Sequence, residues 1–343
     1  MRSRINRWLV ALCDPQGLAD LPAGRMPLSD VVPLMARAEQ QGVGPVVLAN
    51  LERWAQTQSI HRKQCASAAP LAALLAASRP RILHQAGLAL MLRAASGALV
   101  RALAAARVPA TVLKGTDFAD RLYPVAALRP QRDVDLLVPR DALATAEAVL
   151  GGLGYAAVPD PPRKYKDGYG QRIWRRDDAG AVVELHWNLV NSPAVRRGIS
   201  VLYEDLTFEP AVMPGSLPRL TAASCVLLAA VHGATSHSFE RLQLLCDIRQ
   251  LARGAAGPID TAWLADAASR TGSLSALGVA LRLTAQTLRC PSCSVLCQSL
   301  GPRLPSRWSW VLTPAVVLGE APLGAVRRQL FRHLQKNPPC SSL

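Results

Sequence analysis

The chain has 343 residues, enough for two domains or one large one. Hydrophobic residues make up 50% of it and aromatic residues only 5%; Ala and Leu dominate the apolar set, which favours helices over most of the length. The net charge is +15, but 34 of the 39 basic residues are Arg, so the charge indicates an Arg-rich composition more than a dedicated nucleic-acid surface. A basic field would still attract polyphosphates and other anionic substrates.

Two classes of protein are not expected from the apolar segments. No run of about 18 uncharged apolar residues is present, so no transmembrane helix is predicted. The apolar stretch from Trp8 to Leu12 is too short for a signal peptide. We therefore expect a cytoplasmic protein without a membrane span.

The first 107 residues have the pattern of helices. Ile5, Trp8 and Leu12 recur at spacings typical of an amphipathic stripe. A second helix is expected with a cap at Ser29-Asp30, a third starts near Gly44, and a long helix covers residues 81–107. This part of the sequence predicts an N-terminal helical region.

Pro109 ends the long helix, and a short strand is predicted over residues 111–113. Gly115 then permits a tight turn and a close backbone approach. A helix should follow to Tyr123, capped by Thr116 or Asp117. A helix that begins beside a glycine turn is suited to binding phosphate, because its first N–H groups are free.

The next predicted strand, residues 133–138, carries two acids. Side chains alternate faces along a strand, so Asp133 and Asp135 point the same way while Val134 and Leu136 point into the protein. Two adjacent carboxylates repel each other unless they face water or share a cation. Mg²⁺ takes oxygen ligands, usually one or two carboxylates together with substrate phosphates.

A third acid lies in a later hairpin. Residues 155–158 form a predicted strand, and residues 159–170 read as a loop in which Lys164 and Lys166 either grip a nucleotide or are simply solvated. Residues 171–176 and 181–187 form the two arms of the hairpin, and Glu184 and His186 share one face of the second arm.

Together these motifs resemble those of the uncharacterised bacterial nucleotidyltransferases within the DNA polymerase β-like superfamily. The resemblance covers residues 108–251 and rests on the order of its motifs. They are Leu113-Lys114-Gly115, Leu122-Tyr123-Pro124, Arg129, Asp133 to Val138, Gly154-Tyr155, Glu184 to Trp187, and a helical segment with His232, His237, Arg241 and Cys246-Asp247-Ile248.

The resemblance implies a Mg²⁺-dependent enzyme that moves a nucleoside monophosphate from a nucleoside triphosphate, with ATP as one candidate, to a hydroxyl or phosphate. Two Mg²⁺ ions are expected, and the acceptor is an unidentified small molecule, peptide or protein. It implies that Asp133, Asp135 and Glu184 are the catalytic metal ligands. Nucleotide and phosphate binding falls to Lys114, Gly115, Thr116, Arg129 and Arg132, where Lys114 replaces the Ser of the superfamily's more familiar Gly-Ser.

Further pocket candidates are His186, His232, His237, Arg241 and Asp247. Three of them have a structural alternative: His186 can be a satisfied core histidine, and Arg241 and Asp247 can be polar contacts between helices. For His232 and His237 the alternative to a pocket wall is zinc binding. Arg129 or Arg132 can pair with Asp133 instead of phosphate. The cluster of Cys290, Cys293 and Cys297 leaves metal binding or incidental thiols open.

The predicted fold is α+β: a small mixed sheet at residues 108–190, with a helical region before it (1–107), a linker (191–220) and a helical region after it (221–343). Two other functions compete with nucleotidyl transfer. One is a non-catalytic nucleotide-binding module of the same fold. The other, ranked last, is an RNA-directed protein, because no basic stripe with interleaved aromatic residues is present.

Overall fold

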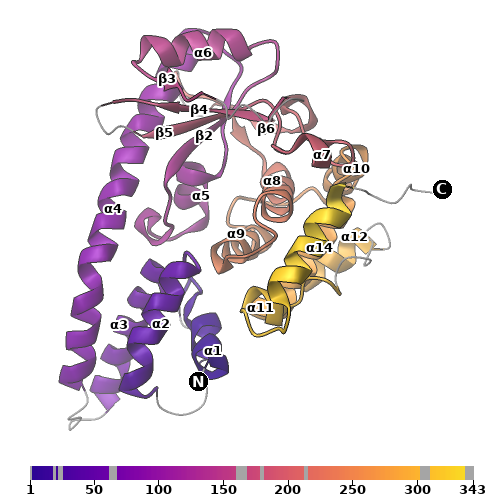
Figure 1. The fold of residues 1–343 in the computed structure, drawn as a ribbon. Coiled ribbons are helices and arrows are strands. Elements are labelled where there is room, and N and C mark those ends of the chain that lie inside the picture. The colour runs from indigo at the N-terminus through magenta and orange to yellow at the C-terminus, as the bar shows by residue number, and fades with distance from the viewer. Residues whose placement is uncertain are drawn as a thin grey trace.

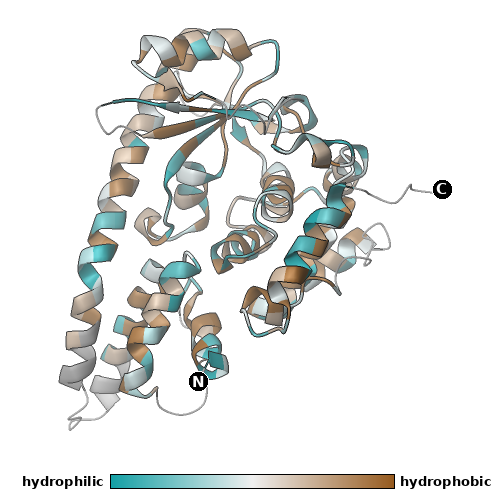
Figure 2. Cartoon of the chain, viewed as in Figure 1, coloured by the Kyte–Doolittle hydropathy of each residue, from teal (hydrophilic) through white to brown (hydrophobic). Residues whose placement is uncertain are grey.

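The computed structural model describes residues 2–17, 21, 26–61, 68–159, 168–177, 181–211, 215–301 and 310–336. It contains a small mixed β-sheet with helices on both sides (Figure 1). The predicted α+β class is therefore confirmed. Figure 2 shows hydrophilic and hydrophobic residues alternating along helices such as α4 (Ala68–Ala105) and α14 (Gly324–Lys336).

The central sheet has five strands in the order β1-β2-β5-β4-β3. Their bounds are β1 (Thr111–Val112), β2 (Asp133–Leu137), β3 (Ala156–Ala157), β4 (Gln171–Arg175) and β5 (Val182–His186). β2 runs parallel to β5, and the other neighbouring pairs are antiparallel. β2 and β5, which carry the three predicted acids, thus lie side by side in the middle of the sheet.

The two faces of the sheet have different partners. Val134 and Leu136 of β2, with Val183 and Leu185 of β5, are buried in a core shared with α4 (Ala68–Ala105) and α6 (Leu143–Gly152). Because side chains alternate along a strand, the acids of β2 and β5 point to the opposite face. That face looks towards α5 (Lys114–Leu122), which lies on the other side of the sheet from α6 (Figure 1).

The N-terminal helices are α1 (Arg2–Leu12), α2 (Leu28–Gln40), α3 (Gly44–His61) and α4. The predicted cap at Ser29-Asp30 is wrong: α2 begins after Pro27, and Asp30 instead accepts two hydrogen bonds from Arg4, at 2.6 and 2.9 Å. The expected cap of α5 is wrong too: no side-chain cap hydrogen bond is formed, the Thr116 hydroxyl lies 3.3 Å from that of Ser96, and Asp117 pairs with arginines. In both places the acid is engaged by an arginine, Asp117 by Arg121 and Arg219.

α4 is the longest helix and runs along one side of the molecule up to the sheet (Figure 1). Its segment Leu75–Ala105 is long and apolar enough to cross a membrane. Its mean hydropathy is 1.5, and 28% of its apolar 18-residue stretch is buried. Core helices of other proteins also meet this criterion. A membrane span is therefore not shown, and its absence stays a prediction.

A short irregular stretch joins the sheet to the C-terminal helices. It contains α7 (Pro193–Arg196), the 3₁₀ turn η2 (Tyr203–Asp205) and the paired strands β6 (Phe208–Glu209) and β7 (Arg219–Leu220). The helices that follow are α8 (Ala222–Thr235), α9 (Leu242–Ala252), α10 (Thr261–Arg270), α11 (Leu274–Leu288), α12 (Pro291–Leu300), α13 (Pro314–Val317) and α14 (Gly324–Lys336). The predicted domain boundaries remain predictions.

The two ends of the described chain share one hydrophobic core. Leu9 and Leu12 of α1 belong to the same buried cluster as Leu245 of α9 and Leu277 of α11. Just after α1, Asp14 accepts two hydrogen bonds of 2.8 Å from Arg253, at the end of α9. The N-terminal helix α1 thus packs against the C-terminal helices α9 and α11.

Candidate active site

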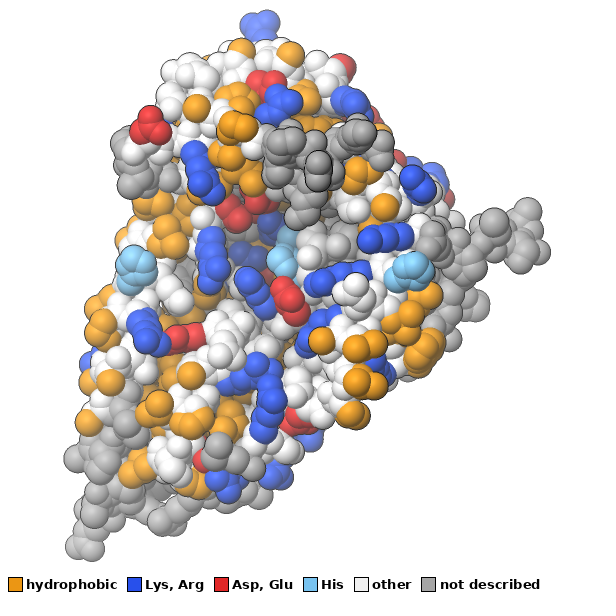
Figure 3. Space-filling model, viewed as in Figure 1, with side chains coloured by type: hydrophobic (Ala, Val, Ile, Leu, Met, Phe, Trp, Pro, Cys, Tyr) orange, Lys and Arg blue, Asp and Glu red, His pale blue; other side chains and the backbone are white. Residues whose placement is uncertain are grey.

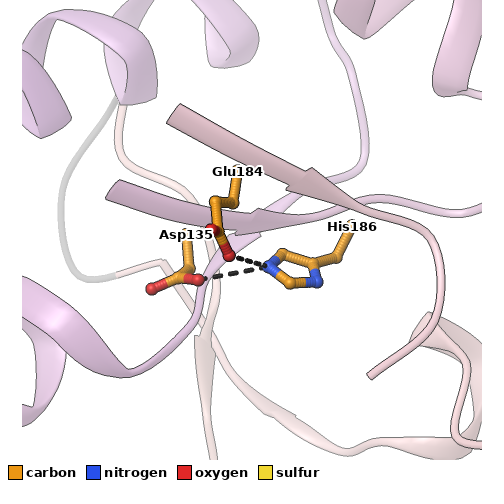
Figure 4. A group of neighbouring side chains, drawn as sticks. All are labelled: Asp135, Glu184 and His186. Carbon is orange, nitrogen blue, oxygen red and sulfur yellow. Dashed lines mark hydrogen bonds and ion pairs between the residues drawn. The ribbon is translucent and has the colours of Figure 1, made fainter. Parts of the chain in front are cut away.

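The pairing of β2 with β5 brings acids from two distant segments together. In the parallel register Asp135 is the partner of Glu184, and Asp133 is the partner of Val182. Asp133, Asp135, Glu184 and His186 therefore project from the same face of the sheet, because each is an even number of residues from its neighbour on the strand. Figure 4 shows Asp135, Glu184 and His186 from adjacent strands pointing towards one another.

His186 joins the acidic pair at its centre. Its Nε2 atom lies 3.1 Å from Oδ1 of Asp135 and 3.5 Å from Oε2 of Glu184 (Figure 4). Burial lowers the pKa of His186, but the hydrogen bonds to Asp135 and Glu184 outweigh it, so the pKa lies above its ordinary value. A protonated imidazole here partly neutralises both carboxylates.

Lys114 supplies the second cation. Its Nζ atom lies 2.5 Å from Oδ2 of Asp135, so both oxygens of this carboxylate contact a basic group. Burial by itself raises the pKa of Asp135, but Lys114 and His186 overcome it and hold the pKa below the usual range. The same attraction raises the pKa of Lys114 against the effect of its burial. Asp135 is thus ionised and Lys114 charged.

The negative charge of Asp133 is neutralised less completely than that of Asp135. Burial raises its pKa to about 6, and the negative charge of Asp135 adds to the shift. Lys114 and His186 act in the opposite direction without cancelling it. A half-buried carboxylate held above its ordinary pKa, beside two more carboxylates, indicates a site with room for further positive charge.

Three of these side chains, those of Asp135, Glu184 and His186, are close enough together to hold a divalent ion, and Asp133 lies outside this group. Ligand atoms of Asp135, Glu184 and His186 lie within 4.8 Å of one another, and no other such His, Cys, Asp and Glu group occurs in the described part of the chain. Hard cations prefer carboxylate oxygens. Cys290 and Cys293 are buried, and with Cys297 they do not form a metal-ligating group by this geometry.

Gly115 forms the turn beside the acids. It has a positive φ of 48°, and its ψ of −119° lies outside the helical range, so the chain bends between Lys114 and the helix that follows. L-amino acids with a side chain disfavour this region, which explains the glycine. The hydroxyl of Thr116 lies 3.3 Å from that of Ser96 on α4, so this side chain is engaged with the scaffold.

The structure places Arg129 differently from the expectation of a phosphate ligand. Its side chain is buried and forms an ion pair with Asp247, with Nη2 2.8 Å from Oδ2. Asp247, expected in the substrate pocket, is the partner of this arginine between the sheet region and α9, and it also lines a small cavity together with Lys114 and His232. Arg132 is exposed, and its predicted role in phosphate binding stays a prediction.

His232 and His237 lie against each other across the connection from α8 to α9. Their ring centroids are 4.8 Å apart in an edge-to-face arrangement. Burial lowers the pKa of both, and the charge of Lys114 lowers that of His232 further. Lys114 and His232 also line one small cavity between α5 and α8. The pair is therefore neutral and stands near the acids, while Arg241 is half-buried at the start of α9.

The arrangement has an open side. Figure 3 shows acidic, basic and histidine side chains gathered in a hollow near the middle of the face in view, below the sheet. Glu184 keeps 23% of its side chain exposed, while Asp135 keeps 1%. Glu184 is thus the acid of this pair that an incoming molecule can reach.

Lys164 and Lys166, expected in a nucleotide-gripping loop, lie outside the described residues. The sequence does not predict Tyr123 as a site residue, yet its hydroxyl donates a 2.8 Å hydrogen bond to Asp247. The motif Leu122-Tyr123-Pro124 was the available signal, but its partner lies more than 100 residues away.

Comparison with known proteins gives one family. Residues 28–289 match the family described as uncharacterised nucleotidyltransferase, a range that includes every predicted site residue. No curated protein matches the chain. The match also extends well beyond residues 108–251, into helices on both sides of the sheet.

Proposed function

The chain belongs to the uncharacterised nucleotidyltransferase family, and we propose that it moves a nucleoside monophosphate from a nucleoside triphosphate to a hydroxyl or phosphate of its acceptor. We assign metal binding to Asp133, Asp135 and Glu184, with Mg²⁺ as the ion and ATP as the first triphosphate to test. A two-acid strand beside a strand with the third acid also supports a DNA polymerase β-like fold.

One observation carries the proposal. Asp135 and Glu184 are direct partners on parallel strands, Asp133 shares their face, and Lys114 touches Asp135 from the adjoining turn. Lys114 and His186 contact Asp135, but the pKa of Asp133 is still raised to about 6, by burial and then by the charge of Asp135. The repulsion among the three carboxylates is offset when they bind a cation and the phosphates that it carries.

In this reaction an oxygen of the acceptor attacks the α-phosphorus of the triphosphate, and pyrophosphate leaves. Negative charge increases on the oxygen that joins the α-phosphorus to the departing pyrophosphate. Bound divalent ions would supply charge to both the attacking and the leaving oxygens. Glu184, the more exposed acid, is placed to accept the proton of an acceptor hydroxyl. His186 contacts Asp135 and would hold it in position, and Lys114, once released from Asp135, would be free to bind phosphate oxygens.

A non-catalytic nucleotide-binding module is the second candidate. It is favoured by the two cations already on Asp135, because Lys114 and His186 neutralise this carboxylate without a metal. Such a module would bind nucleotide with little dependence on Mg²⁺ and would release no pyrophosphate.

A pyrophosphate-release assay separates the two. The protein is incubated with each of the four ribonucleoside triphosphates and Mg²⁺, against a panel of small-molecule, peptide and protein acceptors. The Asp133→Asn/Asp135→Asn double variant, with its fold checked by circular dichroism, should lose transfer. Transfer that survives in this variant would end the catalytic proposal. Nucleotide binding without pyrophosphate release in the wild type would support the module.

A further inference from the structure

The guanidinium of Arg129 is the centre of a buried polar network. Its Nε and Nη2 atoms donate to the two oxygens of Asp247, at 3.0 and 2.8 Å, and its Nη1 donates to the backbone carbonyl of Gly115 at 3.2 Å. Tyr123 donates to the same carboxylate at 2.8 Å. The relative exposures are only 5% for Arg129, 3% for Asp247 and 6% for Tyr123.

Such a network is costly as a source of stability. Removing a charged pair from water costs several kcal/mol per ion, and a buried pair often does no better than well-packed apolar residues. Arg129 also lies over the ring of Phe118 at 5.5 Å, so it is surrounded on several sides. The geometry that the network imposes on Gly115 is therefore a better reason for its presence than stability.

The bond to Gly115 fixes the direction of one peptide group. In a trans peptide the carbonyl and the following N–H point in opposite directions. Because the Gly115 carbonyl turns inward to Arg129, the N–H of Thr116 turns the other way. On the preceding side of the same turn, Lys114 reaches Asp135. Arg129 thus sets the conformation from which both an N–H donor and the lysine ammonium are presented.

We propose that Arg129, held by Asp247 and Tyr123, is a positioning residue for the triphosphate of the nucleotide. It contacts no phosphate itself and acts by fixing the turn at Gly115, so that Lys114 and the Thr116 N–H are presented in one conformation. This inference rests on the proposed function, because it identifies which buried residues prepare the triphosphate site.

A second bidentate pair of Asp and Arg, at the C-terminal end of α9, provides the control; its aspartate is buried and its arginine is 33% exposed. Asp14 accepts two 2.8 Å hydrogen bonds from Arg253, is 3% exposed, and resembles Asp247 in its bidentate arginine. It is bonded to the end of α9 and does not touch Gly115. Loss of the Asp14 pair should therefore lower thermal stability as loss of the Asp247 pair does, while leaving nucleotide binding unchanged.

The experiment compares Arg129→Gln, Arg129→Lys, Asp247→Asn and Asp14→Asn. Thermal midpoints are measured with the dissociation constants of inorganic tripolyphosphate and of ATP with Mg²⁺, and with KM and kcat where transfer is detected. We expect Arg129→Gln and Asp247→Asn to weaken tripolyphosphate and ATP binding and raise KM about tenfold, as for one lost charge-assisted hydrogen bond. The change in kcat should stay within about threefold, since the metal ligands are retained.

Arg129→Lys separates stability from positioning. Lysine retains the charge opposite Asp247 but lacks the planar fork that reaches both Asp247 and Gly115. We expect it to recover most of the thermal midpoint lost in Arg129→Gln while binding tripolyphosphate as weakly. The inference would be overturned if Arg129→Lys bound tripolyphosphate as tightly as the wild type does. It would also be overturned if Asp14→Asn lost as much tripolyphosphate affinity as Asp247→Asn.

The two proposals fail in different ways. A wild-type protein that binds tripolyphosphate but releases no pyrophosphate would end the transferase proposal, and the binding constants of the variants would still decide the role of Arg129. Normal transfer with unchanged KM in Arg129→Gln would end only the positioning proposal. A wild type that binds neither tripolyphosphate nor ATP overturns the positioning proposal directly.

Discussion

Asp135 and Glu184 are partners in the register of the parallel strands β2 and β5, although 48 intervening residues separate them in the chain. Strand pairing fixes their spacing through backbone hydrogen bonds and does not depend on a flexible loop. Of the two, Glu184 is the more exposed and Asp135 the more strongly paired with basic groups. We therefore expect different roles for them, with Glu184 accepting the proton of the acceptor and Asp135 acting only as a metal ligand.

Glu184→Gln should impair transfer without impairing nucleotide binding. The amide keeps the shape but loses the charge that holds an ion and accepts a proton, so we expect a fall in kcat of about 10²–10⁴-fold. The affinity for ATP should change less than about threefold, because Lys114 and the Gly115 turn remain. Single-turnover kinetics and calorimetric titration measure the two effects. A matched control is Glu147→Gln, whose carboxylate pairs with Arg172; equal loss in both variants would contradict the assignment.

Lys114→Met should make the protein depend on a divalent ion for stability. It removes the ammonium 2.5 Å from Asp135, and breaking a buried ion pair costs about 3–5 kcal/mol. Mg²⁺ can then replace the lost charge, so the added ion should raise the thermal midpoint more in Lys114→Met than in the wild type. Lys114→Arg, which retains a charge, should respond as the wild type does. A smaller response to Mg²⁺ in Lys114→Met would show that Lys114 and the ion do not share a site.

The raised pKa of Asp133 predicts that the stability of the protein depends on pH. That pKa is raised from 3.8 to about 6 in the folded protein, chiefly by burial and then by Asp135. A raised pKa means that the folded state retains the proton, so the stability contributed by Asp133 is present below pH 3.8 and lost as pH rises through about 6. Without metal, the thermal midpoint of Asp133→Asn should rise relative to that of the wild type as the pH increases from 3.8 to above about 6.

The same titration can be followed with Mg²⁺ present. Binding of the ion requires ionised carboxylates, so it should favour loss of the Asp133 proton. The rise in thermal midpoint caused by Mg²⁺ should therefore grow as the pH increases through about 6. A difference between the wild type and Asp133→Asn that does not change with pH would contradict the raised pKa.

Gly233→Ala should destabilise the connection that holds His237 beside His232. An added Cβ would lie 2.4 Å from Cε1 of Phe239, whose own backbone has a positive φ of 51°. Overpacking of this kind costs about 1–3 kcal/mol. Gly151→Ala on α6 is the control, since nothing lies within 4 Å of its added Cβ and alanine favours a helix by about 0.5–1 kcal/mol. Chemical denaturation of both variants measures the difference, and equal stability of Gly233→Ala and the wild type would contradict it.

Much of the local structure followed from short-range patterns. The alternation at residues 133–138 predicted a strand with two acids on one face, and β2 (Asp133–Leu137) has that form. The pattern at residues 181–187 likewise predicted the strand of Glu184, and β5 (Val182–His186) confirms it. These inferences needed only the period-two geometry of a strand. The helix caps were wrong because distant arginines compete for the same carboxylates.

Partners far apart in sequence could not be predicted in this way. Arg129 and Asp247 are 118 residues apart, and no local pattern distinguishes a phosphate-binding arginine from one paired with a buried acid. Lys114 was recognised as a cation beside the turn, but its contact with Asp135 depends on how β1 joins β2. The approach of His232 to His237 depends on the chain reversal between α8 and α9.

The sequence by itself determined the α+β class, the acidic face of β2 and the glycine turn, because each depends on residues within a few positions of one another. Tertiary structure alone decided which side chains meet: Asp135 with Glu184, Lys114 and His186, and Arg129 with Asp247 and Gly115. The physical reason is that the strength of an ionic contact depends on distance and burial. Both are set by packing of the whole chain.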